Sequence, residues 1–185
     1  MNSPQEWNWQ ALDTLSVPGG ELPEYLDWLV GNDAKKRARA RKVLYCEVAN
    51  QGDLYSAAAA CVDVIVEHAK SGTVLSPEAV GVLESVLNAR SPGLKVGVGG
   101  ALVDVADYCR GRILEILPQI LYRATGKDVD YFREVCHLIP QLADSSEEVV
   151  NFLVATLAEH DGQLRQFAAD ALEEAREVMV DGHMP

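Results

Sequence analysis

Paired carboxylates are the residues of this chain best suited to acid–base chemistry. The pairs are Asp104 with Asp107, Asp128 with Asp130, Glu147 with Glu148, and Glu173 with Glu174. A hydrolase that uses two carboxyl groups needs both in one cleft, with their pKa values pushed apart. Nothing in the sequence brings any pair into a cleft, and most of the pairs fall on the polar face of an expected helix. We therefore interpret them as solvated surface residues.

Histidine, cysteine and glycine residues form no stronger catalytic or metal-binding pattern. The four histidines and four cysteines are His68, His137, His160, His183, Cys46, Cys61, Cys109 and Cys136. No pair of histidines has the spacing of a metal site on one helix face, and no C-x-x-C pair occurs. The segment Val96–Ala101 is rich in glycine but lacks the Gly-Lys-Ser/Thr ending of a P-loop. We predict no catalytic residues, no cofactor and no metal, and hence a protein that is not an enzyme.

Acidic residues recur at regular spacing near the end of the chain. They occupy positions 170, 173, 174, 177 and 181, at steps of three and four residues opposite an apolar stripe. Like charges at these helical spacings repel each other by about 0.2–0.5 kcal/mol per pair. The ridge could serve solubility alone, or it could attract a basic protein, since complementary potentials speed association. We predict Asp170, Glu173, Glu174 and Glu177 as residues that contact a partner.

The chain is acidic overall, with a net charge of −12, yet it has one compact basic run at Lys35–Lys42. An acidic surface repels phosphate backbones, so we expect no direct binding to nucleic acid. The basic residues wrap around the expected helix rather than forming one stripe. We interpret them as solvated charges that pair with acidic helices of the same chain, with phosphate binding as the alternative.

The elements that carry these residues are expected to be helices. Helical spacing of apolar residues predicts an all-α fold of about eight or nine helices in antiparallel pairs. Ser3-Pro4-Gln5-Glu6 predicts a helix start, with the helix running to about Leu15. Asp33 and Ser76-Pro77 predict the starts of two further helices. No segment has a convincing strand pattern. Lys95–Gly100 is interpreted as a loop or a frayed helix start that leads into a helix at 101–110.

Two similar segments suggest a repeated helical unit. They are Leu117-Pro118-Gln119-Ile120 and Ile139-Pro140-Gln141-Leu142. Each proline is expected to kink its helix, at 112–124 and at 128–143. Repetition at a short period is typical of stacked helix pairs, or α-solenoids, which commonly bind other macromolecules. We predict one domain over residues 1–185, in which residues 1–30 form N-terminal capping helices.

A segment near the middle of the chain resembles a known family. Gln51-Gly52, Tyr55, the alanine run 57–60 and the apolar residues of Val62–Val66 are similar to a repeat unit of bacterial HEAT-like proteins. Asp63 stands where that unit is expected to carry a proline. The resemblance implies a short HEAT-like α-solenoid. Small acidic proteins of this style occur among the immunity proteins that neutralise antibacterial toxins, so the resemblance also implies a protein partner.

The expected location is the cytoplasm. No apolar run approaches the 18 or so residues of a membrane span, and the N-terminus lacks the charged and apolar regions of a signal peptide. Widely spaced cysteines inside apolar helical patterns are typical of buried thiols in a reducing compartment. We therefore predict a cytoplasmic protein without membrane contact, and the sequence leaves its oligomeric state open.

These observations support three functional hypotheses. The leading one is a protein-binding α-solenoid, an immunity protein that occludes a cognate toxin enzyme with a basic surface, such as a nuclease or a nucleotide-degrading enzyme. The second is a HEAT-like scaffold or regulatory protein with no toxin partner. The third is an enzyme built like the HEAT-like DNA glycosylases, which the acidic composition disfavours.

Overall fold

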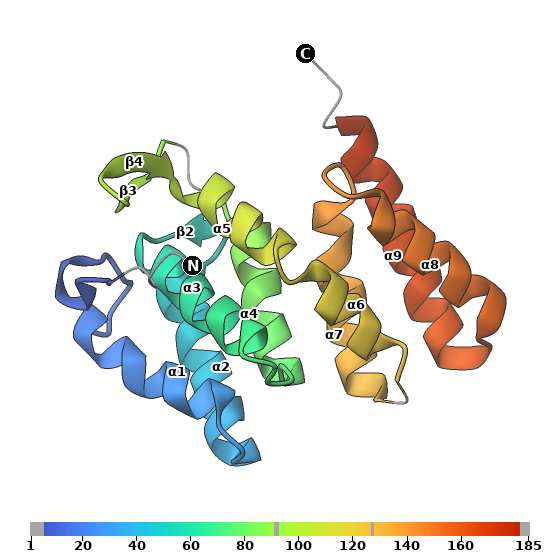
Figure 1. The fold of residues 1–185 in the computed structure, drawn as a ribbon, viewed down its shortest axis with the longest axis horizontal. Coiled ribbons are helices and arrows are strands. Elements are labelled where there is room, and N and C mark those ends of the chain that lie inside the picture. Colours follow the sequence, from blue (N-terminus) through green and yellow to red (C-terminus); the bar gives the residue numbers. More distant parts are fainter. Residues whose placement is uncertain (1–5, 91–92, 127, 182–185) are drawn as a thin grey trace. The chain divides into compact units, whose positions relative to one another are not determined.

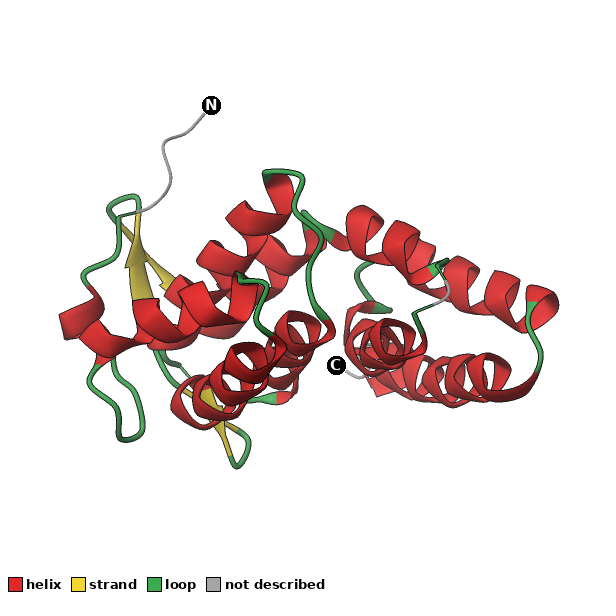
Figure 2. Ribbon diagram, turned by 90° about the horizontal axis from the view of Figure 1, so that it is seen from below, coloured by secondary structure: helices red, strands yellow, loops and turns green. Residues whose placement is uncertain are grey.

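The fold is all-α, as the sequence predicts. The computed structural model describes residues 6–90, 93–126 and 128–181. Over these residues it contains nine α-helices and two small two-stranded sheets (Figure 2). Among the described helices, none is both long enough and apolar enough to cross a membrane.

The chain divides into two compact units, with the boundary between Leu117 and Pro118. The helices of the first unit are α1 (Leu22–Val30), α2 (Ala34–Val48), α3 (Ala57–Lys70), α4 (Pro77–Asn88) and α5 (Val105–Leu114) (Figure 1). Within this unit α1 packs against α2, α2 against α4, and α3 against α5. Helix pairing therefore follows the expectation, while the prediction of a single domain stays a prediction.

The second unit is helical throughout its described part. Its elements are α6 (Leu117–Ala124), α7 (Val129–Leu138), a 3₁₀ helix (Ile139–Leu142), α8 (Glu147–Glu159) and α9 (Gly162–Asp181). α9 is the longest helix and packs against α8, α7 and the 3₁₀ helix. It thereby forms one wall of the unit's core.

Several helices begin where short polar side chains can cap them. Asp33 accepts hydrogen bonds from the backbone N–H groups of Lys35 and Lys36, at 2.9 and 3.1 Å. Ser76 caps α4 in the same way and is followed by Pro77 at the first helical position. These bonds satisfy donors that a helix cannot satisfy internally. Because capping is local, the sequence predicts these helix starts correctly.

The core of the first unit is built around α3. Its alanine run, Ala57–Ala60, is fully buried, with no exposed surface on any of the four side chains. Small side chains let neighbouring helices approach closely, and alanine also has the highest helix propensity. The larger residues Ile65 and Val66 continue the buried surface toward the end of the helix.

The predicted N-terminal helix is wrong. Within the described residues up to Leu15, only Trp9–Ala11 is helical, as one 3₁₀ turn; Ser3-Pro4-Gln5 lies outside the described residues. The segment instead bonds to the start of α3. The backbone N–H of Asp13 donates to Ser56 Oγ at 2.7 Å, and the Asp13 carbonyl accepts from the Ala57 N–H at 3.2 Å. Hydrogen bonds to the start of α3 therefore take the place of the hydrogen bonds within the predicted N-terminal helix.

The glycine-rich segment forms a β-hairpin, not a loop or a helix start. β3 (Lys95–Val98) pairs antiparallel with β4 (Ala101–Asp104), and Gly99 and Gly100 make the turn. Their φ angles of 57° and 85° are positive. Two such residues give the turn whose twist fits a two-residue hairpin. A second small hairpin, β1 (Ala49–Asn50) with β2 (Asp53–Leu54), precedes α3.

The two Pro-Gln motifs mark helix boundaries rather than kinks inside helices. α5 ends at Leu114 and α6 begins at Leu117, so Pro118 lies in the first turn of α6. Pro140 lies in the 3₁₀ helix that follows the end of α7. Proline lacks a backbone N–H, and the first turn of a helix does not require that donor. The predicted continuous helices at 112–124 and 128–143 are therefore each divided.

Candidate functional site

The predicted contact residues lie together on the solvent side of α9. Asp170, Glu173, Glu174 and Glu177 are all exposed, and we call these four residues the acidic face of α9. The opposite side of the helix is apolar. Ala168, Ala171, Leu172 and Ala175 are buried there, with Leu164, Phe167 and Met179 half-buried. The spacing that predicts this amphipathic helix is confirmed, and the contact role stays a prediction.

The acidic face of α9 keeps its negative charge. Gln141 Nε2 donates to Glu174 Oε1 at 2.7 Å, and Gln166 Nε2 donates to Asp170 Oδ1, also at 2.7 Å. Both donors are neutral amides, which orient a carboxylate without neutralising it. Within the described part of the chain, none of the four carboxylates forms an ion pair.

Negative charge is concentrated in the second unit. From Pro118 onward the sequence contains thirteen acidic and five basic side chains, a net charge of −8. The longer first unit contains fifteen acidic and eleven basic side chains, a net charge of −4. The field of a protein depends on how its charges are distributed, and a region of one sign raises the rate of encounter with ligands of the opposite sign. α9 therefore lies in the unit best suited to attract cations.

A second cluster of charged side chains lies in the first unit, around Asp63 of α3. This carboxylate is only 6% exposed. Both of its oxygens accept from Tyr108 Oη at 2.8 Å, Oδ1 also accepts from Arg112 Nε at 2.7 Å, and Oδ2 from Trp7 Nε1 at 2.9 Å. The Trp7 and Tyr108 rings also meet edge to face, with centroids 6.3 Å apart. Asp63 thus joins α3, α5 and the N-terminal segment.

The outer part of this cluster is an ion-pair network. Arg112 donates through Nη2 to Glu67 Oε1 at 2.5 Å and through Nη1 to Glu115 Oε2 at 2.6 Å. Lys70 forms ion pairs with both of these glutamates. The hydrogen bond from Arg112 lowers the pKa of Glu67, and hydrogen bonds from Lys70 and Arg112 outweigh burial and lower that of Glu115. These carboxylates are ionised and paired with cations, so the network links α3 to α5 and the residue that follows it.

Sequence reasoning missed this network, although one signal pointed to it. Asp63 is a charged residue within the apolar run Val62–Val66, where the HEAT-like unit is expected to carry a proline. A buried carboxylate needs hydrogen-bond donors or a cation. The donors come from Trp7, Tyr108 and Arg112, which are 45 to 56 residues away, and no local pattern identifies them.

Glu47 of α2 is a second buried carboxylate, 3% exposed. It accepts hydrogen bonds from the Ser16 backbone N–H at 2.7 Å, the Ser16 hydroxyl at 2.6 Å and the Val17 N–H at 3.0 Å. Burial raises the pKa of Glu47, but these bonds outweigh it, and the pKa lies below its ordinary value. Glu47 therefore holds the N-terminal segment in place through hydrogen bonds to its ionised carboxylate.

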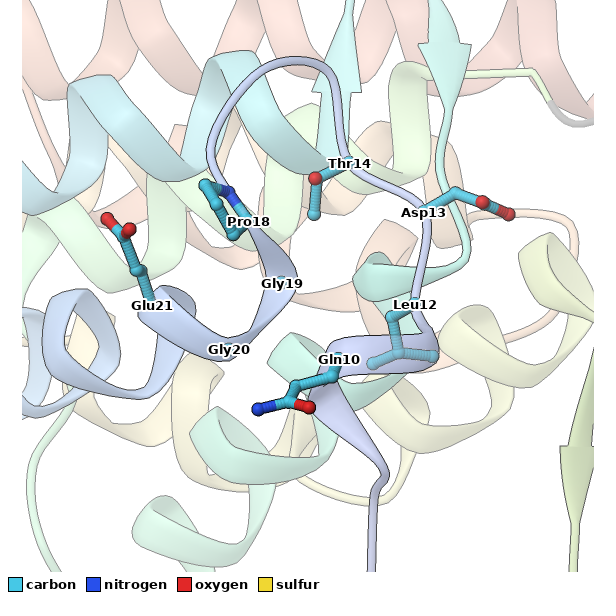
Figure 3. A pocket seen from close by; sticks show the side chains of 8 residues that line it. All are labelled: Gln10, Leu12, Asp13, Thr14, Pro18, Gly19, Gly20 and Glu21. Carbon is cyan, nitrogen blue, oxygen red and sulfur yellow. The ribbon is translucent and has the colours of Figure 1, made fainter.

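A pocket of about 550 Å³ lies along the same N-terminal segment (Figure 3). Its lining runs from Gln10 to Glu21 and includes Pro18, Gly19 and Gly20. The two acidic residues of the lining, Asp13 and Glu21, lie on opposite sides of it in Figure 3. The lining contains no histidine, cysteine or basic residue.

The other candidate residues of the sequence serve the fold or face solvent. Asp104 caps α5 and Asp128 caps α7, while Asp107 and Asp130 are exposed. Among the remaining candidates, the exposed side chains are Glu147, Glu148 and His137, and the half-buried ones are His68, His160 and Cys46. The buried ones are Cys61, Cys109 and Cys136. His183 lies outside the described residues. Over the described residues, no group of three or more His, Cys, Asp or Glu side chains could hold a metal ion.

Comparison with known proteins adds no relative. No family model, curated protein or solved structure matches this chain. The case for function therefore depends on the charges and surfaces of the molecule itself.

Proposed function

We propose that this protein binds another protein through the acidic face of α9, and that it acts as an immunity protein by occluding a toxin enzyme. The observation that carries the proposal is the acidic face itself: four exposed carboxylates within two turns of one helix, without an ion pair among the described residues. Repulsion between like charges at this spacing destabilises a helix. A binding role gives a reason for that cost.

The rigid support of α9 favours a binding role. Ala168, Ala171 and Ala175 are each no more than 3% exposed, because the helix packs closely on its neighbours. A surface held by a packed core loses little conformational entropy when it binds, and this favours affinity. The acidic face of α9 is therefore preorganised.

The charge of the proposed site defines the chemistry of the partner. An enzyme that acts on a nucleic acid or a nucleotide binds phosphate with arginine and lysine, so its active cleft is basic. An acidic helix face could fill such a cleft and exclude the substrate. The partner class we propose is accordingly a nuclease or a nucleotide-degrading toxin.

The proposal is tested with the protein encoded beside the gene for this chain. Purified chain should bind that protein, and co-expression should protect cells from its toxicity. The variant E173K/E174K should bind at least about tenfold more weakly at low ionic strength, because it replaces attraction with repulsion. A matched control is E147K/E148K, which reverses two adjacent exposed glutamates at the start of α8.

Three outcomes would count against the proposal. Equal losses of affinity in E173K/E174K and E147K/E148K would assign the effect to overall charge and not to α9. Binding without protection would favour a scaffold role over immunity. Salt-dependent binding of the chain to duplex DNA, with no protein partner, would support the glycosylase-like alternative.

A further inference from the structure

The basic run of α2 is divided between two faces of the helix. Arg37 and Arg41 turn toward α4: Arg37 Nε lies 3.2 Å from Glu78 Oε2, and a Cβ added at Gly81 would meet the Arg41 guanidinium at 2.4 Å. Lys35, Arg39 and Lys42 are exposed on another face. Their spacing of four and three residues places them in one line along the helix. The basic run therefore surrounds the helix, and these three cations lie in line on its exposed side.

We call Lys35, Arg39 and Lys42 the basic stripe of α2. Among the described residues these side chains form no ion pair, although the chain carries 28 acidic residues. Other cations of the same unit, such as Lys70 and Arg112, pair with two or more carboxylates each. The basic stripe is thus available to a partner.

Aromatic residues of α1 organise the middle of the basic stripe. The Arg39 guanidinium lies 5.4 Å from the centre of the Trp28 ring, and Lys36 Nζ lies 5.5 Å from it. Tyr25 contacts the Trp28 ring edge to face, with centroids 5.3 Å apart. Cation–π contacts hold a side chain in place without neutralising its charge. Arg39 is therefore preorganised to bind an anionic group.

The basic stripe is better suited to an acidic helix than to a nucleic acid. The Trp28 ring already contacts two cations, so it is not free to stack on a base. Three cations in a line neutralise few of the phosphates of a nucleic acid. An acidic helix has a lower charge density, and its carboxylates recur at the same spacing.

We propose that the basic stripe of α2 docks on the acidic face of α9 in a second copy of this chain. The two surfaces match in sign and in length. Lys35 and Lys42 are seven residues apart, as are Asp170 and Glu177, and this separation is about 10 Å along a helix. A contact between two different surfaces is heterologous, so each bound copy leaves one basic stripe and one acidic face open for further copies.

The contact regulates the proposed function, because a copy bound to the acidic face of α9 covers the residues proposed to bind the toxin. It uses the same carboxylates but does not depend on the existence of a toxin. Exposed ion pairs are individually weak and are screened by salt. Self-association is therefore expected at high protein concentration and low ionic strength, and is lost when salt is added.

The experiment is sedimentation equilibrium of the purified full chain. At about 20 mM salt the weight-average mass should rise with protein concentration, and at about 500 mM salt it should stay that of the monomer. The variant K35E/R39E and the variant E173K/E174K should each stay monomeric in both salts. The control R90E/K95E reverses two exposed cations outside α2 and should associate like the wild type.

Mixing the two monomeric variants gives the sharpest result. K35E/R39E has an acidic α2, and E173K/E174K has a basic α9, so together they should form a complex that neither forms alone. A wild-type mass that is independent of protein concentration at about 20 mM salt would overturn the proposal. Self-association of either charge-reversal variant alone would overturn it, and so would a mixture of the two variants that stays monomeric. Circular dichroism of each variant establishes that it is folded. Because only this chain is present, failure here leaves the toxin proposal intact.

Discussion

Buried carboxylates determine the path of the N-terminal segment at the scale of single residues. Glu47 and Asp63 lie on different helices, yet both accept hydrogen bonds from residues that precede α1. A buried carboxylate needs hydrogen-bond donors to replace the water that it loses. The segment around Trp7 and Ser16 therefore bonds to these side chains instead of forming the helix that its own sequence predicts.

Replacement of Glu47 tests this role. Glu47→Gln should lower the free energy of unfolding by about 1–3 kcal/mol at neutral pH, because an amide cannot accept all the bonds that the carboxylate accepts. Urea denaturation measures the change. The control Glu24→Gln, at an exposed position of α1, should change stability by less than about 0.5 kcal/mol.

The pH dependence of Glu47 follows from its pKa, which is lower in the folded protein than its ordinary value of 4.5. A carboxyl group with a lowered pKa stabilises the fold above the unfolded pKa, and the contribution is lost as pH falls through the folded pKa. The difference in stability between wild type and Glu47→Gln should therefore be largest above about pH 5 and shrink below it. A difference that grows as pH falls would contradict the ionised state of Glu47.

The Asp63 cluster gives a graded prediction. Asp63→Asn should cost about 2–3 kcal/mol, because it removes a charged acceptor from Arg112 in a nearly buried site. Glu115→Gln removes a partner of the same arginine, but the Glu115 side chain is 41% exposed and its loss should cost less than about 1 kcal/mol. Chemical denaturation of both variants compares them, and equal costs would mean that burial does not set the strength of these pairs.

At the scale of elements, the sequence predicts what depends on local chemistry. The helices that start after Asp33 and Ser76 are predicted because each cap bonds to the next few residues. The acidic and apolar sides of α9 are predicted because both follow from helical spacing. The prediction for the N-terminal segment is wrong because the hydrogen-bond partners of this segment are distant in sequence. The β3–β4 hairpin is not predicted because its four-residue strands are too short to show an alternating pattern.

The β3–β4 hairpin depends on its two turn glycines. Gly100 has a φ of 85°, which L-residues rarely adopt, so Gly100→Ala should destabilise the hairpin by about 1–2 kcal/mol. Hydrogen exchange at Val98 and Ala101 should accelerate accordingly. Gly97→Ala is the control: Gly97 lies in β3, and no atom lies within 4 Å of an added Cβ. Similar acceleration in both variants would contradict the assigned turn.

At the scale of the whole molecule, charge is the property that connects structure to function. The second unit carries a net charge of −8 on 68 residues and presents the acidic face of α9, while the first unit carries the basic stripe of α2. In the described part of the chain, no group of three or more His, Cys, Asp or Glu side chains could hold a metal ion. The helical core supports two surfaces of opposite sign.

The central claim is that the acidic face of α9 binds a toxin. The most direct test is the rate of association between this chain and the protein encoded beside its gene. Stopped-flow measurements should give an association rate constant for the wild-type chain that falls steeply between about 20 and 500 mM salt. E173K/E174K should associate at least about tenfold more slowly at the lower salt, with a flatter salt dependence, while E147K/E148K stays close to the wild type. An E173K/E174K variant with the rate and salt dependence of the wild type would contradict the assignment of the acidic face of α9 as the binding surface.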